Sequence, residues 1–204
     1  MPSVTRLPDI HEWYSPERVA AEEAIWAEGQ HYLMNAKRIQ TLCDARFLTT
    51  IIEFGCGTGW IPTVLSRDLD YLGLDANPYM LKIARTKSDA TFVRWDFRFP
   101  YDRATDLACS FAVLKHFSLT DWPVMLRRML QNARFGLFNQ HCLQDDRTPF
   151  DDGKEWHSIW PRNSDILAAI EAYGHILISR DDSIIDPLVG APETYFVTQR
   201  RSNA

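Results

Sequence analysis

The spacing of hydrophobic positions changes several times along the chain, and these changes predict strands that alternate with helices. Short runs of β-branched and apolar residues that end at glycine or a small polar residue are typical of buried strands. Such runs predict strands over 48–54, 71–75, 91–95, 106–113, 135–139, 176–179 and 194–198. Apolar residues at helical spacing predict helices over 15–44, with a break near Gly29, and over 60–66, 78–87, 119–131 and 164–173.

The order of these elements predicts an α/β fold with a doubly wound, mostly parallel sheet of seven strands. Ser15, Asn77 and Ser164 stand at the predicted starts of three helices, where a small polar side chain can cap the backbone. No helix separates the last two predicted strands, so we expect the last strand to pair antiparallel with its neighbour.

Length sets the domain count. The chain of 204 residues corresponds to one domain with room for a small elaboration. We expect an N-terminal arm and helical segment over 1–45 and a core over 46–204. The first residues lack the apolar stretch of a secretory signal, and no run approaches the roughly 18 apolar residues of a membrane span. These features predict a cytoplasmic protein that does not bind a membrane.

The charge balance argues against a nucleic-acid partner. Lys and Arg total 22, Asp and Glu total 27, and the net charge is −5. Binding along a nucleic-acid backbone usually requires a basic face, because phosphate contacts supply most of the affinity. A local basic strip remains open as an alternative, since five cations lie close together in the sequence: Arg85, Lys87, Arg94, Arg98 and Arg103.

The cysteines are spread along the chain, at positions 43, 56, 109 and 142. They form no CxxC pair, so the spacing does not favour a zinc site or a disulfide framework. We therefore expect reduced thiols in the core of the protein, as in most cytosolic chains. The acidic loop residues Asp145, Asp146, Asp151 and Asp152 likewise lack a firm ligand spacing, and we predict no metal site.

The most informative segment lies between the first predicted strand and the helix after it. Residues 53–59 read Glu-Phe-Gly-Cys-Gly-Thr-Gly. Glycines allow a tight turn and let the backbone approach a ligand without a Cβ in the way, and the amides of the following helix face that ligand. Asp75 ends the second predicted strand, where an acid can accept hydrogen bonds from both hydroxyls of a ribose.

The glycine spacing separates two classes of ligand. Dinucleotide-binding loops have the pattern G-x-G-x-x-G and hold a pyrophosphate on the helix N-terminus. The pattern here is G-x-G-x-G, and Glu53 stands two residues before the first glycine. A carboxylate beside the loop repels a pyrophosphate but suits a ligand with an ammonium group. The motif therefore disfavours a nicotinamide cofactor and favours a cationic nucleoside.

In these elements the chain resembles the class I S-adenosylmethionine-dependent methyltransferases. Residues 73–81 look like the second-strand segment of that family, 92–96 like its third strand, and 106–117 like its fourth strand with the loop beyond. The resemblance covers roughly residues 48–179. It implies a Rossmann-like fold, S-adenosyl-L-methionine as cofactor and S-adenosyl-L-homocysteine as product.

The resemblance also implies a set of cofactor-binding residues. They are Glu53, Gly55, Cys56, Gly57, Gly59, Asp75, Ala76, Asn77, Asp96, Phe97 and Phe111. In this set Glu53 lies near the cofactor ammonium and Asp75 holds the ribose, while Asp96 accepts from the adenine amino group. Three plainer interpretations stay open: Asp75 caps the next helix, Asp96 is a turn residue, and Phe111, like Trp95, is a core aromatic.

The chemistry expected of the family is in-line displacement, which depends mainly on positioning donor and acceptor. His116, after the fourth strand, is the candidate general base, and a loop or capping role is the alternative. We expect substrate or lid contacts from Tyr14, Tyr32, His141 and Trp160. The N-terminal helical segment would then act as a lid, and the loop over 141–162 is a second candidate cover for the substrate.

These features together predict a methyltransferase that acts on a small molecule: a metabolite, a natural product or a sugar. Two alternatives stay open. One is a methyltransferase that acts on nucleic acid or protein, and the other is a non-catalytic module that binds S-adenosylmethionine or S-adenosylhomocysteine. The sequence does not give the acceptor atom or the oligomeric state.

Overall fold

The computed structural model describes residues 15–29, 31–142, 150–151, 159–186 and 191–202. The chain forms two compact units, Met1–Phe99 and Pro100–Ala204, which we call the N-terminal and C-terminal units and describe one at a time. From the sequence we instead expect a boundary between residues 45 and 46. That boundary stays a prediction.

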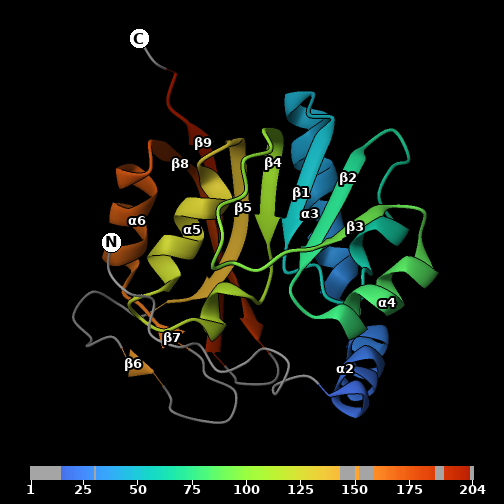
Figure 1. The fold of residues 1–204 in the computed structure, drawn as a ribbon. Coiled ribbons are helices and arrows are strands. Elements are labelled where there is room, and N and C mark those ends of the chain that lie inside the picture. Colours follow the sequence, from blue (N-terminus) through green and yellow to red (C-terminus); the bar gives the residue numbers. More distant parts are fainter. Residues whose placement is uncertain (1–14, 30, 143–149, 152–158, 187–190, 203–204) are drawn as a thin grey trace. The chain divides into compact units, whose positions relative to one another are not determined.

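The N-terminal unit contains three parallel strands with helices beside them (Figure 1). Its strands are β1 (Thr50–Phe54), β2 (Asp70–Asp75) and β3 (Thr91–Arg94). Its helices are α2 (Pro16–Gly29), α3 (His31–Arg46), the 3₁₀ turn η1 (Ile61–Thr63) and α4 (Pro78–Lys87). The predicted break near Gly29 and the predicted bounds of α4 are confirmed.

The register of β1 and β2 positions the site. Glu53 pairs with Gly73, and Phe54 pairs with Leu74. Because paired residues of parallel strands lie level with each other, the two strands end side by side. The loop that follows β1 therefore lies beside Asp75, the last residue of β2.

The helix predicted over 60–66 is wrong, because only the 3₁₀ turn η1 forms there. The backbone leaves helical geometry at Val64, with φ of −124° and ψ of −2°. The Ser66 amide, which would have continued a helix, donates instead to Gln40 Oε1 at 3.1 Å. A hydrogen bond to α3 thus replaces the local helical bond that the apolar spacing predicted.

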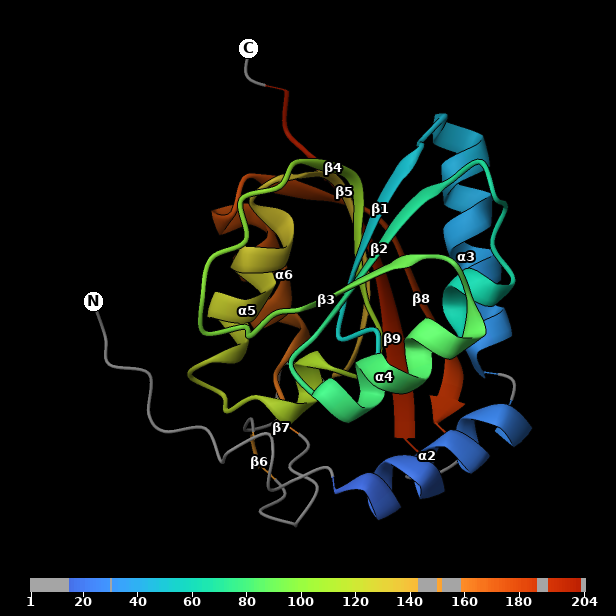
Figure 2. The ribbon, with the colours of Figure 1, turned by 45° about the vertical axis from the view of Figure 1, so that its right-hand side comes forward.

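The C-terminal unit combines parallel and antiparallel strands. Its main strands are β4 (Thr105–Ser110), β5 (Ala133–His141), β8 (His175–Asp186) and β9 (Ala191–Arg200), and β6 (Phe150–Asp151) pairs with β7 (Ile159–Trp160). Its helical elements are η2 (Leu114–His116), α5 (Trp122–Leu130) and α6 (Asn163–Ala172). Figures 1 and 2 show α5 and α6 side by side.

The strand order is β3-β2-β1-β4-β5-β9-β8. β4 and β5 are parallel, whereas β9 is antiparallel to both β5 and β8. The expected α/β, Rossmann-like fold with seven mostly parallel strands and an antiparallel last strand is confirmed.

Several bounds in the C-terminal unit differ from the expectations: the strand predicted over 106–113 ends at Ser110, and the helix predicted over 119–131 begins at Trp122. The strand predicted over 176–179 is longer, because register shifts between Leu177 and Ser179 and between Asp181 and Ile184 let β8 continue past its polar residues. Helix α6 begins one residue before the predicted cap, and its N-cap is Arg162 rather than Ser164. The Asp165 carboxylate accepts from the Arg162 amide at 3.3 Å.

Apolar burial holds each unit together. Helix α5 buries Met125, Leu126, Met129 and Leu130, and β1 buries Ile51, Ile52 and Phe54. Burying a side chain of this size stabilises the fold by roughly 1.5–3 kcal/mol relative to leaving it in water.

Within the described residues, no helix is both long enough and apolar enough to span a membrane.

Candidate functional site

The loop of residues 55–59, here called the glycine loop, turns from β1 into η1 through left-handed backbone. Gly55, Gly57 and Gly59 have φ of +78°, +53° and +72°. A Cβ at Gly59 would lie 2.7 Å from the Cβ of Ala84 and 2.9 Å from Cζ of Phe92. Only glycine fits there, because the loop packs directly against α4 and β3.

The amides of Gly55, Cys56, Gly57 and Gly59 are bonded within the protein. Gly55 and Cys56 donate to the Leu74 carbonyl at 2.7 and 3.0 Å, and Gly59 donates to the Cys56 carbonyl at 3.0 Å. The Gly57 amide donates to Asp75 Oδ2 at 2.9 Å. A pyrophosphate site requires amides that point at the ligand. With these donors engaged and two carboxylates nearby, the surroundings of the loop suit a ligand that donates hydrogen bonds.

Asp75 is the acid that anchors the loop. Its Oδ2 accepts from Gly57, and its Oδ1 accepts from the Asn77 amide at 2.8 Å. Burial raises the pKa of Asp75, and the hydrogen bonds from Asn77, Gly57 and Ala76 oppose that shift. Each carboxylate oxygen has a second lone pair. The three amides use three of about four lone-pair sites, so Asp75 can still accept a further donor such as a hydroxyl group.

The cap of α4 is Asn77, not Asp75. The Asn77 Oδ1 accepts from Tyr79 at 2.8 Å and from Met80 at 3.3 Å. The side chain of Asn77 is buried and its oxygen caps the helix, and a ligand contact from this residue stays a prediction. The carbonyl of the preceding Ala76 accepts from Arg94 Nε at 3.2 Å.

Glu53 is buried near the end of β1. The Tyr71 hydroxyl donates to its Oε2. Burial raises the pKa of Glu53 to about 8, with the Tyr71 hydrogen bond opposing the shift and the charge of Asp75 adding to it. At neutral pH the carboxyl therefore keeps its proton in the free protein. A positively charged group beside it would favour the ionised form.

Cys56 is a small, inert filler in the loop. Its Sγ lies 2.9 Å from the position that a Cβ would take at Gly73. Burial raises the pKa of the Cys56 thiol well above its ordinary value, so the thiolate needed for nucleophilic chemistry does not form at neutral pH. All four cysteines are free thiols, as the sequence predicts.

The predicted adenine-binding residues follow β3. Asp96 accepts from the backbone amide and from Nε of Arg98, both at 2.8 Å. Phe97 and Trp95 are buried, with ring centroids 4.8 Å apart, and both contact Phe54. Their contact with adenine stays a prediction, as does that of Asp96.

In the N-terminal elaboration, the Tyr32 ring lies against the Trp60 ring, with centroids 4.8 Å apart. Tyr32 therefore contacts the residue that directly follows the glycine loop. Tyr14, the other predicted lid tyrosine, lies outside the described residues.

The turn after β4 contains a left-handed residue that is not glycine. Ala112 has φ of +57°, and its amide donates to Asn139 Oδ1 at 2.7 Å. Phe111 is buried before it, and its ring centroid lies 6.3 Å from that of Tyr195. His116 ends η2 and is half-buried, with its backbone amide bonded to the Val113 carbonyl at 3.0 Å.

Two of the predicted substrate residues meet at the carboxyl end of β5. The His141 and Trp160 rings stack with centroids 4.7 Å apart and an angle of 23° between their planes. The Gln140 amide donates to the Ile159 carbonyl at 2.9 Å and ties β7 to β5. The expected loop over 141–162 thus contains the strand pair β6–β7, which places Trp160 on His141.

The sequence comparison decides the class of protein. Residues 51–136, which include the glycine loop, Asp75 and the turn after β4, match the family model described as methyltransferase domain. This segment of the chain is similar to a methyltransferase domain. The resemblance that the motifs indicate is confirmed, and so is the expected enzyme class. No curated protein sequence matches the chain.

Solved structures of other methyltransferases share the fold. An amino pentose methyltransferase from Micromonospora echinaspora, solved with S-adenosylmethionine, is 15% identical with a TM-score of 0.71 over 89% of this chain and 97% of that chain. The 1,6-didemethyltoxoflavin-N1-methyltransferase of Burkholderia thailandensis, with bound S-adenosylhomocysteine, is 12% identical with a TM-score of 0.69 over 98% and 94%. Magnesium protoporphyrin IX methyltransferase from Synechocystis PCC 6803 is 14% identical with a TM-score of 0.65 over 82% and 79%. The ligands in these structures agree with the expected cofactor.

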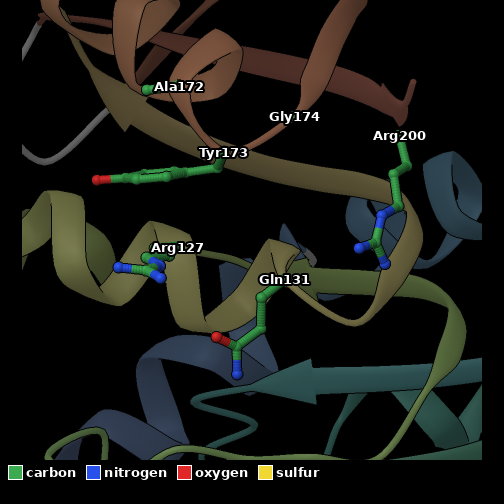
Figure 3. Close-up of a pocket in the computed structure, with 6 residues that line it drawn as sticks. All are labelled: Arg127, Gln131, Ala172, Tyr173, Gly174 and Arg200. Carbon is green, nitrogen blue, oxygen red and sulfur yellow. The ribbon is translucent and has the colours of Figure 1, made fainter. Parts of the chain in front are cut away.

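The C-terminal unit has a surface cavity of about 440 Å³ (Figure 3). Arg127, Gln131, Tyr173 and Arg200 border it, at the amino end of β5 and the carboxyl ends of α5 and α6. Ligands of open α/β sheets bind outside the carboxyl ends of the strands. The position of the cavity at the amino end of β5 therefore does not favour it as the methyl-acceptor site.

Sequence reasoning missed several groups that hold the site: Glu23, Trp60, Tyr71 and Lys87. The signal for Tyr71 was present, because side chains two residues apart on a strand share a face. With Glu53 level with Gly73, Tyr71 falls on the same face as Glu53. No local pattern marks the other three residues.

Proposed function

We propose that this methyltransferase uses S-adenosylmethionine to methylate a small-molecule acceptor. The observation that carries the proposal is the pair of acids at the glycine loop. Glu53 and Asp75 flank a loop whose described amide bonds run within the protein. This arrangement favours a cationic, hydroxyl-bearing nucleoside over a pyrophosphate.

The residues present fit that cofactor. Asp75 has remaining acceptor capacity for a ribose hydroxyl, and Glu53 is positioned to become a carboxylate when an ammonium group approaches. Asp96 would accept from the adenine amino group beside the buried rings of Trp95 and Phe97. The Phe111 ring would face the sulfonium through its electron-rich face, which attracts cations.

When bound, S-adenosylmethionine supplies a methyl group on a cationic sulfur, and the bond from sulfur to methyl breaks as the bond from acceptor to methyl forms. The protein has to orient the acceptor and exclude water, and positioning alone can lower the barrier by roughly 7–11 kcal/mol. An acceptor that carries a proton must lose it, and His116 is our candidate for the base. His116 lies at the carboxyl end of β4, where the turn holds Ala112 in a fixed conformation.

A small acceptor is favoured by the Trp160 ring, which stacks on the buried His141 at the end of β5 and remains partly exposed. The net charge of −5 supports the same choice, since a nucleic-acid substrate usually requires a basic face. The solved relatives are named for an amino pentose, a toxoflavin precursor and a metalloporphyrin. We infer that the acceptor is a molecule of that size class.

The first experiment measures cofactor binding by calorimetry. We expect S-adenosylhomocysteine and S-adenosylmethionine to bind and NADH not to bind. Asp75→Asn should weaken binding by roughly 10–100-fold, because a hydrogen bond to a charged group contributes about 1.5–3 kcal/mol. Asp89→Asn is the matched control on an exposed carboxylate. Equal affinity in Asp75→Asn and wild type would contradict the ribose assignment.

The second experiment identifies the class of acceptor. Labelled cofactor is incubated with pooled amino sugars, heterocycles and carboxylic acids, and in parallel with RNA, DNA and protein. Product in the small-molecule pools supports the proposal. Product only with a macromolecule would overturn the acceptor class, and cofactor binding without any product would indicate a binding module.

A further inference from the structure

One cation in the N-terminal unit connects three segments that are far apart in the sequence. Lys87, the last residue of α4, has its Nζ 3.0 Å from the Thr58 carbonyl in the glycine loop. The same ammonium pairs with the Glu23 carboxylate of α2 and lies 4.0 Å from the centre of the Trp60 ring. Figure 2 shows α2 beside α4, which agrees with this contact.

The arrangement is partly shielded from water. The side chains of Lys87 and Glu23 are 15% and 23% exposed. An ion pair in this environment is less screened than a surface pair. Burial lowers the pKa of Lys87, and the hydrogen bond and charge of Glu23 oppose that shift. The Glu23 carboxylate therefore compensates the cost of burying the Lys87 ammonium.

Glu23 also holds the indole that follows the loop. Its second oxygen accepts from Trp60 Nε1 at 3.1 Å. The Trp60 ring also contacts the Tyr32 ring of α3. The carboxylate thus bridges Lys87 and Trp60, and the ammonium lies over the indole. These three side chains, with Thr58, form what we call the α2 latch.

The latch holds the glycine loop one residue further along the chain than Asp75 does. Asp75 accepts the amide of Gly57, and Lys87 donates to the carbonyl of the following residue, Thr58. The Asp75 carboxylate and the Lys87 ammonium therefore hold two successive residues of the glycine loop, one by its amide and the other by its carbonyl. The adjacent Gly59 packs closely against α4, since a Cβ added there would lie 2.7 Å from the Cβ of Ala84.

We propose that Lys87 is a positioning residue for the glycine loop, and that Glu23 makes ligand affinity at the loop depend on the docking of α2. This inference rests on the proposed function, because the ligand is the proposed cofactor. Linkage is reciprocal: if docked α2 favours the ligand-binding loop, then the bound ligand stabilises docked α2.

The test compares variants of the latch by S-adenosylhomocysteine calorimetry. Lys87→Met keeps the chain length and removes the charge and the donors, and we expect the dissociation constant to rise on the order of tenfold. Lys87→Arg keeps the charge and can stack on Trp60, so it should restore most of the affinity. Lys82→Met on the exposed side of α4 is the matched control and should leave affinity unchanged.

Hydrogen exchange reads out the coupling without any turnover. In wild type, S-adenosylhomocysteine should slow exchange both in residues 55–60 and in α2. In Lys87→Met and Glu23→Gln, the ligand should still slow exchange in the loop, but α2 should lose its added protection. Adding Glu23→Gln to Lys87→Met should change little further, because both act on one contact.

The outcomes separate the two proposals. Wild-type affinity and α2 protection in Lys87→Met would overturn the positioning role and leave the proposed function standing. A wild-type protein that binds neither S-adenosylmethionine nor S-adenosylhomocysteine would overturn both. If Lys87→Met does not fold, Glu23→Gln and Lys87→Arg decide the matter, since wild-type α2 protection in Glu23→Gln contradicts the role of the latch.

Discussion

Two turns of this methyltransferase leave a parallel strand through left-handed backbone, and they reach that conformation in different ways. After β1, glycines at 55, 57 and 59 adopt positive φ without a steric penalty. After β4, Ala112 adopts φ of +57°, a conformation that costs an alanine roughly 1–2 kcal/mol. There the Asn139 side chain, on the neighbouring strand β5, holds the Ala112 amide.

The comparison shows that one turn is encoded locally and the other by a distant partner. The glycine loop adopts its shape from its own residues, and its partners then fix its position. The turn after β4 depends on a buried side chain 27 residues away. Strain of this kind persists only where the surroundings enforce it, and it concentrates at functional sites. The glycine loop belongs to the proposed cofactor-binding residues, and the turn after β4 lies between two other proposed residues, Phe111 and His116.

The largest expected effect comes from a comparison of two glycines. It separates the cost of a steric clash from the cost of a positive φ. Gly59→Ala should lower the free energy of unfolding by about 2–5 kcal/mol and abolish S-adenosylhomocysteine binding, because the new methyl group meets Ala84 and Phe92 in addition to the strained φ. Gly174→Ala is the matched control, with φ of +76° and no atom within 4 Å of the added Cβ. It should lose only about 1–2 kcal/mol in urea denaturation.

Equal losses in Gly59→Ala and Gly174→Ala would show that the close packing of the loop against α4 has no energetic consequence. That result would contradict the view that close packing constrains the glycine loop.

A smaller effect tests the other turn. Asn139→Ala should lower the free energy of unfolding by about 1–3 kcal/mol, because the Ala112 amide loses its partner. Ala112→Gly should relieve the backbone strain, and the greater freedom of glycine in the unfolded chain offsets about 0.4–1 kcal/mol of that gain. Urea denaturation of both single variants and the double variant measures the coupling.

In the Ala112→Gly background, Asn139→Ala should have a reduced effect, because glycine keeps the turn without help. Strict additivity of the two changes would contradict the view that Asn139 stabilises a strained residue.

The smallest expected effect concerns pH. Burial raises the pKa of Glu53 to about 8 from an ordinary 4.5, with Tyr71 and Asp75 as its charged or hydrogen-bonding neighbours. An ammonium group binds the ionised carboxyl, so affinity for S-adenosylhomocysteine should rise with pH by up to about tenfold per unit below pH 8. Glu53→Gln keeps an acceptor for Tyr71 and should flatten this dependence. Calorimetry from pH 6 upward measures it, and a flat wild-type profile would contradict the coupling.

The same shift has a consequence for stability. The folded protein retains a proton that the unfolded chain releases, so the contribution of protonated Glu53 is fully present below pH 4.5 and is lost as the pH rises through 8. Unliganded wild type should therefore lose stability over this range relative to Glu53→Gln, as urea denaturation at several pH values would show.

The sequence predicted most of the fold, because strands and helices with clear periods form where their periods say. Helix α4 begins at the predicted proline behind the predicted Asn77 cap. The helix over 60–66 failed because Gln40 of α3 takes the amide that would have continued it. The spacing of nearby residues cannot indicate a hydrogen-bond acceptor that lies far away in the chain.

The candidate site shows the same division. The glycines, Glu53 and Asp75 are visible in the sequence, because the strand, the tight turn and the two acids follow one another at short spacing. The stacking of His141 on Trp160 required the strand pair β6–β7 inside a segment that was expected to be a loop. Each residue was a candidate, but their contact was not predictable.

By itself, the sequence determined the α/β fold, the glycine loop and the acids at the ends of β1 and β2, because glycine conformation, periodicity and the alternation of strand faces act over a few residues. Only the tertiary structure decided that Lys87 and Glu23 hold the loop, that Tyr71 contacts Glu53 and that Asn139 restrains Ala112. These contacts join segments far apart in the chain, and strand register and helix packing bring them within hydrogen-bonding distance.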